Sequence, residues 1–396
     1  MGVFNFNPSK KPPLRGLGVF NYNHSKKPPL RGVGVFNFNP NRKPPLRGLG
    51  VFYMAEPKIY VSNEPLTLEC GDVLPSVTIA YHTYGTLSPT ADNVIWVCHA
   101  LTANSEVADW WPHTVENGRF LDPDRHFIVC ANFLGSCYGT TGPASVNPAT
   151  GEEWGLSFPQ ITVRDMVSCH QLLARYLGIT SVQLLVGASI GGFQAMEWAV
   201  MQPSFARRLA LICTTARITP WVAAFNESQR MAIEADTTFT TPSPEAGRQG
   251  MAVARSIALL TYRGRSGYVR SQANPDADDT CFNHRVLSYQ RYQGEKLRRR
   301  FDARSYYRLT QAVDSHNLSR HRGTLPEVLS SITCPTLVVA CTTDIMFPPS
   351  EHEEMVAHLP HCTYELIHSP FGHDGFLVEA DQLNALILDF LNKEQI

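Results

Sequence analysis

Apolar runs of strand length alternate with amphipathic segments of helical length along most of the chain. The runs are continuous rather than alternating, which is typical of strands buried on both faces of a parallel sheet. The predicted strands lie at residues 93–98, 127–131, 182–186, 209–213, 335–340 and 364–367. Because helices between parallel strands cover the faces of a sheet, the pattern predicts an α/β fold with a mostly parallel sheet.

Signals for other elements are more local. Residues 66–84 alternate polar and apolar positions and are interrupted at Gly71 and Pro75, which predicts an antiparallel hairpin. Thr162 and Asp165 have capping-box spacing and predict the start of a helix. The apolar face of that helix comprises Val163, Met166, Val167, Leu173 and Leu177. A last amphipathic helix is expected near residues 382–391.

The strand rhythm stops between residues 214 and 330, where helical patterns alternate with polar stretches. We interpret this segment as a helical lid inserted into an α/β core. The core would then comprise residues 54–213 and 331–396. A chain of 396 residues is long enough for a large core with such an insertion.

Residues 1–53 differ from the rest, because they repeat a 16-residue unit three times and begin a fourth copy. They hold nine Lys and Arg and no Asp or Glu, which leaves the remainder with a net charge of −10. The segment is rich in Pro and poor in apolar residues, so it cannot build a core. We interpret it as a disordered tail or as sequence translated upstream of a true start at Met54, rather than as a basic interaction tail.

Composition narrows the class of protein further. No apolar run has the length of a signal peptide core or a membrane span. The ten cysteines include no C-x-x-C pair, which favours reduced thiols in a cytoplasmic protein over disulfides or zinc. We therefore expect no metal, no nucleic acid and no membrane among its partners.

The clearest chemical motif is Gly187-Ala188-Ser189-Ile190-Gly191, which follows an apolar strand and precedes a helix. This is the context of a nucleophile elbow, in which a serine hydroxyl is exposed on a tight strand-to-helix turn. The alternative is an ordinary glycine-rich loop. Ser189 is thus the candidate nucleophile.

A serine needs a base and an acid to become a nucleophile, and in this fold they follow it in the order acid, then histidine. Asp344 comes after the strand at 335–340, and His373 comes after the strand at 364–367. Each residue alone could be a turn or surface residue, but both occur in the expected order. By position, the backbone amides of Ile190 and Leu101 would form the oxyanion hole.

Several segments together resemble the homoserine O-acetyltransferase family, and the resemblance extends from about Leu66 to the C-terminus. They are residues 99–102, 132–148, 158–167, 189–198, 225–227, 300–306, 314–316 and 372–374. The resemblance implies an α/β-hydrolase fold and a ping-pong transfer of an acetyl group from acetyl-CoA to L-homoserine through Ser189. It also implies that Arg255 holds the substrate carboxylate and Asp374 its ammonium group, and that the protein is a dimer through the lid. No tightly bound cofactor is implied.

Four alternatives stay open at this point. Succinyl-CoA as donor or serine as acceptor would use the same triad, and so would a hydrolase of small esters. A scaffold acting through residues 1–53 would not need the triad.

The chain departs from the family pattern at Ile190, where the family often has Met. We expect this difference to change the shape of the acyl pocket and to leave the backbone amide in place. The basic run at Lys296 and residues 298–300 suits a solvated helix face better than a CoA-phosphate site.

Overall fold

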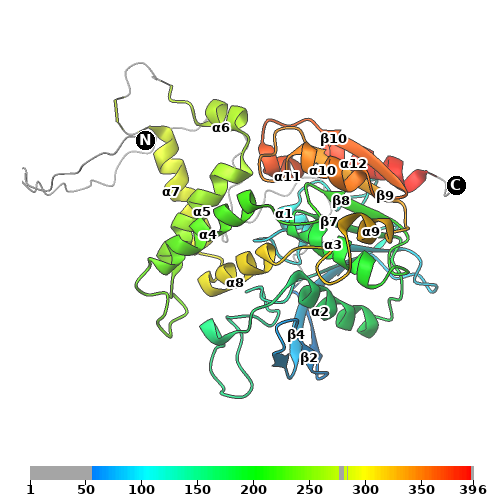
Figure 1. The fold of residues 1–396 in the computed structure, drawn as a ribbon, viewed down its shortest axis with the longest axis horizontal. Helices are drawn as coiled ribbons and strands as arrows, with labels where there is room; N and C mark the ends of the chain where they lie inside the picture. Colours follow the sequence, from blue (N-terminus) through cyan, green and yellow to red (C-terminus); the bar gives the residue numbers. More distant parts are fainter. Residues whose placement is uncertain (1–55, 276–280, 283, 394–396) are drawn as a thin grey trace, which may run out of the picture. The chain divides into compact units, whose positions relative to one another are not determined.

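The computed structural model describes residues 56–275, 281–282 and 284–393. The predicted tail at residues 1–53 lies outside the described residues. The described chain is built on an eight-stranded sheet in the order β1-β4-β6-β5-β7-β8-β9-β10 (Figure 1). Its strands are β1 (Lys58–Ser62), β4 (Val77–Tyr84), β5 (Val94–Cys98), β6 (Phe127–Ala131), β7 (Leu184–Ala188), β8 (Leu209–Ile212), β9 (Thr336–Cys341) and β10 (Cys362–Ile367).

The sheet is parallel from β6 to β10 and antiparallel where β4 pairs with β1 and β6. The predicted mostly parallel sheet is therefore confirmed. Every residue of β5, β7, β8 and β9 is buried, because helices cover both faces. Helices α2 (Val163–Tyr176) and α3 (Ile190–Met201) pack on one face, and α1 (Val107–Trp110) and α12 (Ala380–Asn392) pack on the other.

Helix α2 begins where its sequence signals place it. Thr162 Oγ1 accepts a hydrogen bond from the Asp165 amide, and the Asp165 carboxylate accepts one from the Thr162 amide. This capping box satisfies two of the amides that a helix start leaves without partners. Of the predicted apolar face, Val163, Met166, Val167 and Leu173 are buried, and Leu177 packs against the same core.

The predicted single hairpin over residues 66–84 is wrong in its extent. Strands β2 (Leu66–Thr67) and β3 (Val73–Leu74) form a separate two-stranded sheet, and β4 joins the main sheet instead. Pro75 has no amide hydrogen to donate, so the small ladder ends before it. The edge strand β1 was not predicted, because its residues lack a clear apolar pattern.

Helices follow one another between β8 and β9. They are α4 (Pro220–Glu234), α5 (Arg248–Tyr262), α6 (Arg265–Gln272), α7 (Arg285–Arg298), α8 (Ala303–Asp314) and α9 (Leu325–Ser330). The described residues in this part of the chain contain no strand. Ile233, Met251, Tyr306 and Leu309 of these helices belong to the same apolar core as α2 and α3. In Figure 1, α4, α5, α6 and α7 form a group that stands beside the sheet layer.

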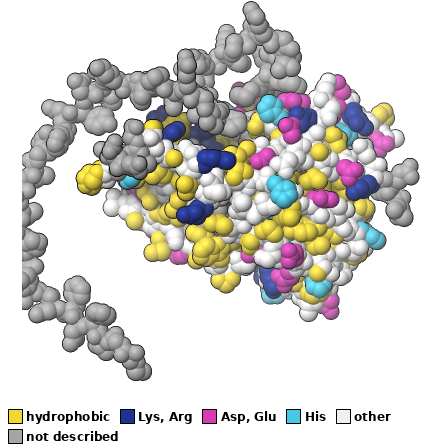
Figure 2. Space-filling model, turned by 90° about the horizontal axis from the view of Figure 1, so that it is seen from above, with side chains coloured by type: hydrophobic (Ala, Val, Ile, Leu, Met, Phe, Trp, Pro, Cys, Tyr) yellow, Lys and Arg dark blue, Asp and Glu magenta, His cyan; other side chains and the backbone are white. Residues whose placement is uncertain are grey.

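Four short helical segments complete the described chain: the helices α10 (Pro349–Val356) and α11 (Gly375–Val378), and the 3₁₀ turns Gly155–Ser157 and Gly372–Asp374. None of the described helices is both long and apolar enough to cross a bilayer. All ten cysteines are described, and none forms a disulfide; five are buried and Cys70 and Cys281 are exposed. On the face drawn in Figure 2, the described Lys and Arg side chains are interspersed with Asp and Glu.

Candidate active site

The turn between β7 and α3 holds Ser189 in a strained backbone conformation, with φ 56° and ψ −126°. A non-glycine residue at positive φ is uncommon and clusters at functional sites. The flanking glycines are sterically required. A Cβ on Gly187 would lie 2.1 Å from the Gly191 carbonyl oxygen, and a Cβ on Gly191 would lie 2.1 Å from that of Cys98. The local structure is therefore the strand–turn–helix that a nucleophile elbow needs.

Neighbouring strands fix the position of this turn. The Ser189 amide donates to the Ile212 carbonyl at 3.0 Å, and Thr214 Oγ1 donates to the Ser189 carbonyl at 2.9 Å. The Thr214 side chain also fills the space beside Gly192, where a Cβ would lie 2.5 Å from Thr214 Oγ1. Ser189 is thus held by contacts to the end of β8 as well as by its own turn.

Asp344 and His373 lie together, 2.7 Å apart between Oδ2 and Nδ1. The other carboxylate oxygen of Asp344 accepts hydrogen bonds from the Met346 amide at 2.8 Å and the Phe347 amide at 3.1 Å. Both side chains are nearly inaccessible, with 3% of Asp344 and 4% of His373 exposed. Because Nδ1 donates to Asp344, Nε2 is the nitrogen left to accept a proton.

Aromatic rings enclose His373. The ring centroids of Phe347, Phe376 and Tyr262 lie 5.3, 5.5 and 5.9 Å from that of His373. Burial among these rings disfavours the charged imidazolium. The negative charge of Asp344 and its hydrogen bond, together with the charge of Asp374, outweigh burial, so the pKa of His373 is raised. This arrangement favours proton uptake by His373.

Ser189 lies at the same sheet edge as the Asp344–His373 pair. Strands β7, β9 and β10 are parallel, and Ser189, Asp344 and His373 each follow the carboxyl end of one of them. Phe347 links the two parts, since its ring lies 5.7 Å from Phe193 of α3 and 5.3 Å from His373. Among the hydrogen bonds of the described residues, none joins Ser189 Oγ to His373. Catalytic hydrogen bonds are often long without substrate and tighten in the reacting complex.

The two backbone amides predicted for the oxyanion hole lie on neighbouring segments, the start of α3 and the loop after β5. Ile190 is the first residue of α3, so its amide has no partner within the helix. Leu101 follows β5, and the start of α3 packs against the end of that strand at Cys98 and His99. Within the described residues, neither the Ile190 nor the Leu101 amide donates a hydrogen bond. Both are therefore available to an external acceptor.

The predicted substrate-binding residues have different surroundings. Arg255 on α5 lies with its guanidinium carbon 5.5 Å from the Tyr262 ring centroid, and no described carboxylate pairs with it. Asp374 is already paired, because its Oδ2 lies 2.9 Å from Arg263 Nε. The sequence offered no signal for Arg263, since its importance depends on where α5 ends. It ends against the loop that carries His373.

Glycines permit this contact between the end of α5 and the His373 loop. A Cβ on Gly264 would lie 2.4 Å from the Pro370 carbonyl oxygen, and one on Gly372 would lie 2.3 Å from the Gly264 nitrogen. The Gly267 amide donates to Pro370 at 3.2 Å. Backbone thus packs directly on backbone where the end of α5 meets the His373 loop.

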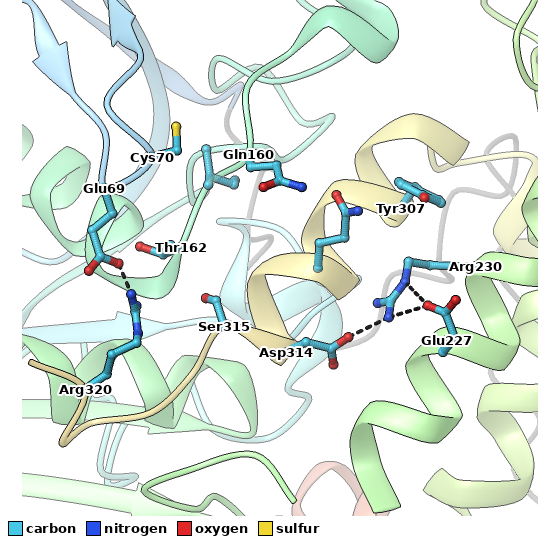
Figure 3. Close-up of a pocket in the computed structure, with 12 residues that line it drawn as sticks. Glu69, Cys70, Gln160, Thr162, Glu227, Arg230, Tyr307, Asp314, Ser315 and Arg320 are labelled. Carbon is cyan, nitrogen blue, oxygen red and sulfur yellow. Dashed lines mark hydrogen bonds and ion pairs between the residues drawn. The ribbon is translucent and has the colours of Figure 1, made fainter. Parts of the chain in front are cut away.

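A polar cavity of about 520 Å³ lies elsewhere, between α4, α8, the β2–β3 hairpin and the start of α2 (Figure 3). It contains none of the predicted site residues. Its charged side chains pair with one another: Arg320 lies 2.7 Å from Glu69, and Arg230 lies 2.7 Å from Asp314. We interpret the cavity as a polar junction between elements. In the described part of the chain, no group of His, Cys, Asp and Glu side chains is arranged to bind a metal.

Comparisons with known proteins identify the fold and the family of the chain. Residues 93–380 match the family model of the alpha/beta hydrolase fold, which defines the class of the protein. A homoserine O-acetyltransferase from Chloroherpeton thalassium is 43% identical over 331 residues, which cover 82% of this chain and 86% of that protein. The chain belongs to the homoserine O-acetyltransferase family, a group of acyltransferases that use this fold.

Solved structures share the fold more broadly. The homoserine O-acetyltransferase from Bacillus anthracis has a TM-score of 0.79 at 23% identity, covering 86% of this chain and 99% of that one. An acetylester hydrolase from Corynebacterium glutamicum has a TM-score of 0.76 at 23% identity, with coverage of 85% and 96%. Transferases and hydrolases therefore share this architecture, and the fold alone does not separate them.

Proposed function

We propose that this protein transfers the acetyl group of acetyl-CoA to the side-chain hydroxyl of L-homoserine, with Ser189 as the acyl carrier. The observation that carries the proposal is the buried Asp344–His373 pair, 2.7 Å apart, at the sheet edge where Ser189 follows β7. Family membership supplies the substrates. Asp344, His373 and Ser189 would act as acid, base and nucleophile.

In the first half-reaction, Ser189 Oγ attacks the thioester carbonyl while His373 Nε2 takes its proton. The carbonyl oxygen becomes an oxyanion and accepts hydrogen bonds from the Ile190 and Leu101 amides. When the tetrahedral intermediate collapses, the carbon–sulfur bond breaks. His373 returns the proton to the departing CoA thiolate, and acetyl-Ser189 remains.

In the second half-reaction, His373 Nε2 takes the proton of the homoserine hydroxyl, and the alkoxide oxygen attacks acetyl-Ser189. Collapse of the second intermediate returns the proton to Ser189. We assign Arg255 to the substrate carboxylate, because a guanidinium fork matches a carboxylate and no described acid occupies it. Asp374 would hold the ammonium group and share its charge with Arg263.

The competing functions use the same triad and differ in the acyl donor and acceptor. The discriminating experiment measures CoA release from acetyl-CoA and from succinyl-CoA, each with homoserine, with serine and with no acceptor. We expect rapid release only with acetyl-CoA and homoserine together. Release at the full rate without an acceptor would establish a hydrolase and refute the transferase proposal.

We further assign residues 54–213 and 331–396 to the hydrolase core and residues 214–330 to a lid, since the described helices α4–α9 all fall in the latter range. The proposed co-substrate is acetyl-CoA, with no tightly bound cofactor. We place the protein in the cytoplasm, where acetyl-CoA is available and where unpaired cysteines persist.

A homodimer through the lid is the proposed assembly. The lid helices present apolar side chains that are more than half exposed, namely Val253 and Leu260 on α5, Val269 on α6 and Leu287 on α7. Exposed apolar patches often mark interfaces. Light scattering should give a dimer for the wild-type protein and a monomer for Leu260→Asp. Val146→Asp, at an equally exposed loop position, should stay dimeric; a wild-type monomer would refute the assembly.

A further inference from the structure

We propose that Arg300, in the segment between α7 and α8, is a positioning residue that holds the loop carrying the oxyanion-hole amide of Leu101. The proposal rests on the function proposed above. It assigns to a lid side chain a part in the chemical step, although Arg300 would not contact the substrate.

The guanidinium group of Arg300 binds the residue directly after Leu101. Its Nη1 donates to the Thr102 carbonyl oxygen at 2.5 Å, and its Nη2 donates to Thr102 Oγ1 at 3.3 Å. Two nitrogens of one planar group thus bind the backbone and the side chain of a single residue. Such a forked contact restricts rotation of the loop as well as its displacement.

A second contact anchors the arginine itself. Nη1 also donates to Tyr138 Oη at 2.6 Å, and the Tyr138 carbonyl oxygen accepts a hydrogen bond from Asn132 Nδ2 at 2.8 Å. The Tyr138 ring packs edge-on against Phe301 at 5.5 Å. Arg300 therefore bridges the loops that follow β5 and β6, and its own position is supported by the second of these.

The residues just before Leu101 in the same loop are fixed in a different way. The His99 ring stacks on Phe133 at 4.1 Å, and His99 Nδ1 hydrogen-bonds the Ala100 carbonyl at 2.9 Å. Leu101 lies between this buried anchor and Thr102. The amide of Leu101 is thus held from the core on one side and from the lid on the other.

The neighbouring arginines show that this contact is specific to Arg300. Arg298 and Arg299 each lie within 2.9 Å of Glu295, one turn earlier on the same helix. In the described chain, Arg300 forms no ion pair and directs its donors to neutral acceptors of the loop instead. The basic run therefore contains two arginines that pair locally and one that reaches the active-site loop.

The amide hydrogen-bond donors of the oxyanion hole stabilise the tetrahedral intermediate. A displaced amide therefore slows acyl transfer from any acyl substrate. Loss of one such donor costs about 10²- to 10³-fold in kcat. Arg300→Ala leaves the Leu101 amide present but less well placed, so we expect a loss of kcat of about 10- to 100-fold, below that range. The KM for homoserine should change little.

The test compares Arg300→Ala, Arg300→Lys and Arg299→Ala in two assays. One is acetyl transfer from acetyl-CoA to homoserine, and the other is single-turnover acylation by p-nitrophenyl acetate, which lacks the CoA moiety. We expect Arg300→Ala to be slow in both assays and Arg299→Ala to match the wild type. Arg300→Lys keeps the charge but lacks the fork, so it should be intermediate. Added guanidinium ion should partly restore Arg300→Ala.

Two results would overturn the proposal. One is an unchanged rate in Arg300→Ala; the other is a raised KM for acetyl-CoA with normal acylation by p-nitrophenyl acetate, which would make Arg300 a CoA-binding residue. If Arg300→Ala does not fold, Arg300→Lys decides between the same outcomes. Wild-type protein that acylates with the ester but never transfers acetyl to homoserine would instead refute the proposed function and leave this test valid.

Discussion

At the scale of single residues, the proposed chemistry depends on opposing effects on the pKa of His373. Burial among three aromatic rings disfavours its charged form, whereas Asp344 and Asp374 favour it. The result is a raised pKa, which makes His373 a stronger base than an ordinary histidine. Since only the neutral imidazole accepts a proton, activity should fall as pH falls through this raised pKa.

Asp344→Asn tests that balance. The substitution removes the charge that raises the pKa of His373 and leaves the burial that lowers it. The acid limb of the kcat/KM profile should therefore move to lower pH, and the maximal rate should fall by about 10⁴-fold, as in other triads with this change. The exposed residue Asp389, changed to Asn, is the control. An acid limb that stays in place would mean that another group titrates.

Arg255 carries the prediction for substrate binding. Arg255→Ala should raise the KM for homoserine about 10- to 100-fold, equivalent to a lost charge-assisted hydrogen bond of about 1.5–3 kcal/mol, with kcat little changed. Arg270→Ala, exposed on α6, should behave as the wild type in steady-state kinetics. If Arg255→Ala left the KM unchanged, Arg263 would become the candidate carboxylate ligand.

Residues of the site differ in how far the sequence could predict them. The elbow around Ser189 is encoded within five residues, because the turn needs glycines at Gly187 and Gly191. Asp344 and His373 could be assigned from their order after two strands. The contacts of Arg263 and Arg300 could not be predicted, since each side chain reaches a loop far away in the chain.

At the scale of elements, the end of α5 and the His373 loop pack closely against each other. The end of α5 packs on residues 370–372 through backbone contacts that only glycine allows. Buried parallel strands were predictable from their continuous apolar runs. The division of residues 66–84 between two sheets was not, because it depends on which strands β4 meets.

Gly264→Ala tests whether the end of α5 and the histidine loop are coupled. Gly264 has φ −66°, which suits alanine, but the new Cβ would meet the Pro370 carbonyl at 2.4 Å. We expect overpacking to lower the free energy of unfolding by about 1–3 kcal/mol. We also expect a larger loss of kcat than in the control variant, because the new Cβ displaces His373.

Gly178→Ala is the matched control for that experiment. Gly178 has φ +69° and no atom within 4 Å of the new Cβ, so alanine there costs about 1–2 kcal/mol of backbone strain without touching the site. Thermal unfolding should show similar losses of stability in Gly178→Ala and Gly264→Ala. Kinetics should show a normal kcat for Gly178→Ala alone. Equal kcat in both variants would contradict the coupling.

At the scale of the whole molecule, every strand of the described residues and every predicted site residue lies between Lys58 and Asn392. Removal of residues 1–53 should therefore leave kcat, KM and the melting temperature of the enzyme unchanged. The comparison is between the full chain and a chain that starts at Met54. Abolished activity in the shorter chain would support the alternative in which the repeats carry the function.

The fold is shared by acetyltransferases and ester hydrolases, so the identity of the acyl acceptor is the central claim. The most direct measurement is mass spectrometry of the protein mixed with acetyl-CoA before and after homoserine is added. We predict one acetyl group on Ser189, released as O-acetylhomoserine on addition of the acceptor and absent in Ser189→Ala. Continuous CoA release without homoserine, or acetyl transfer by Ser189→Ala, would contradict it.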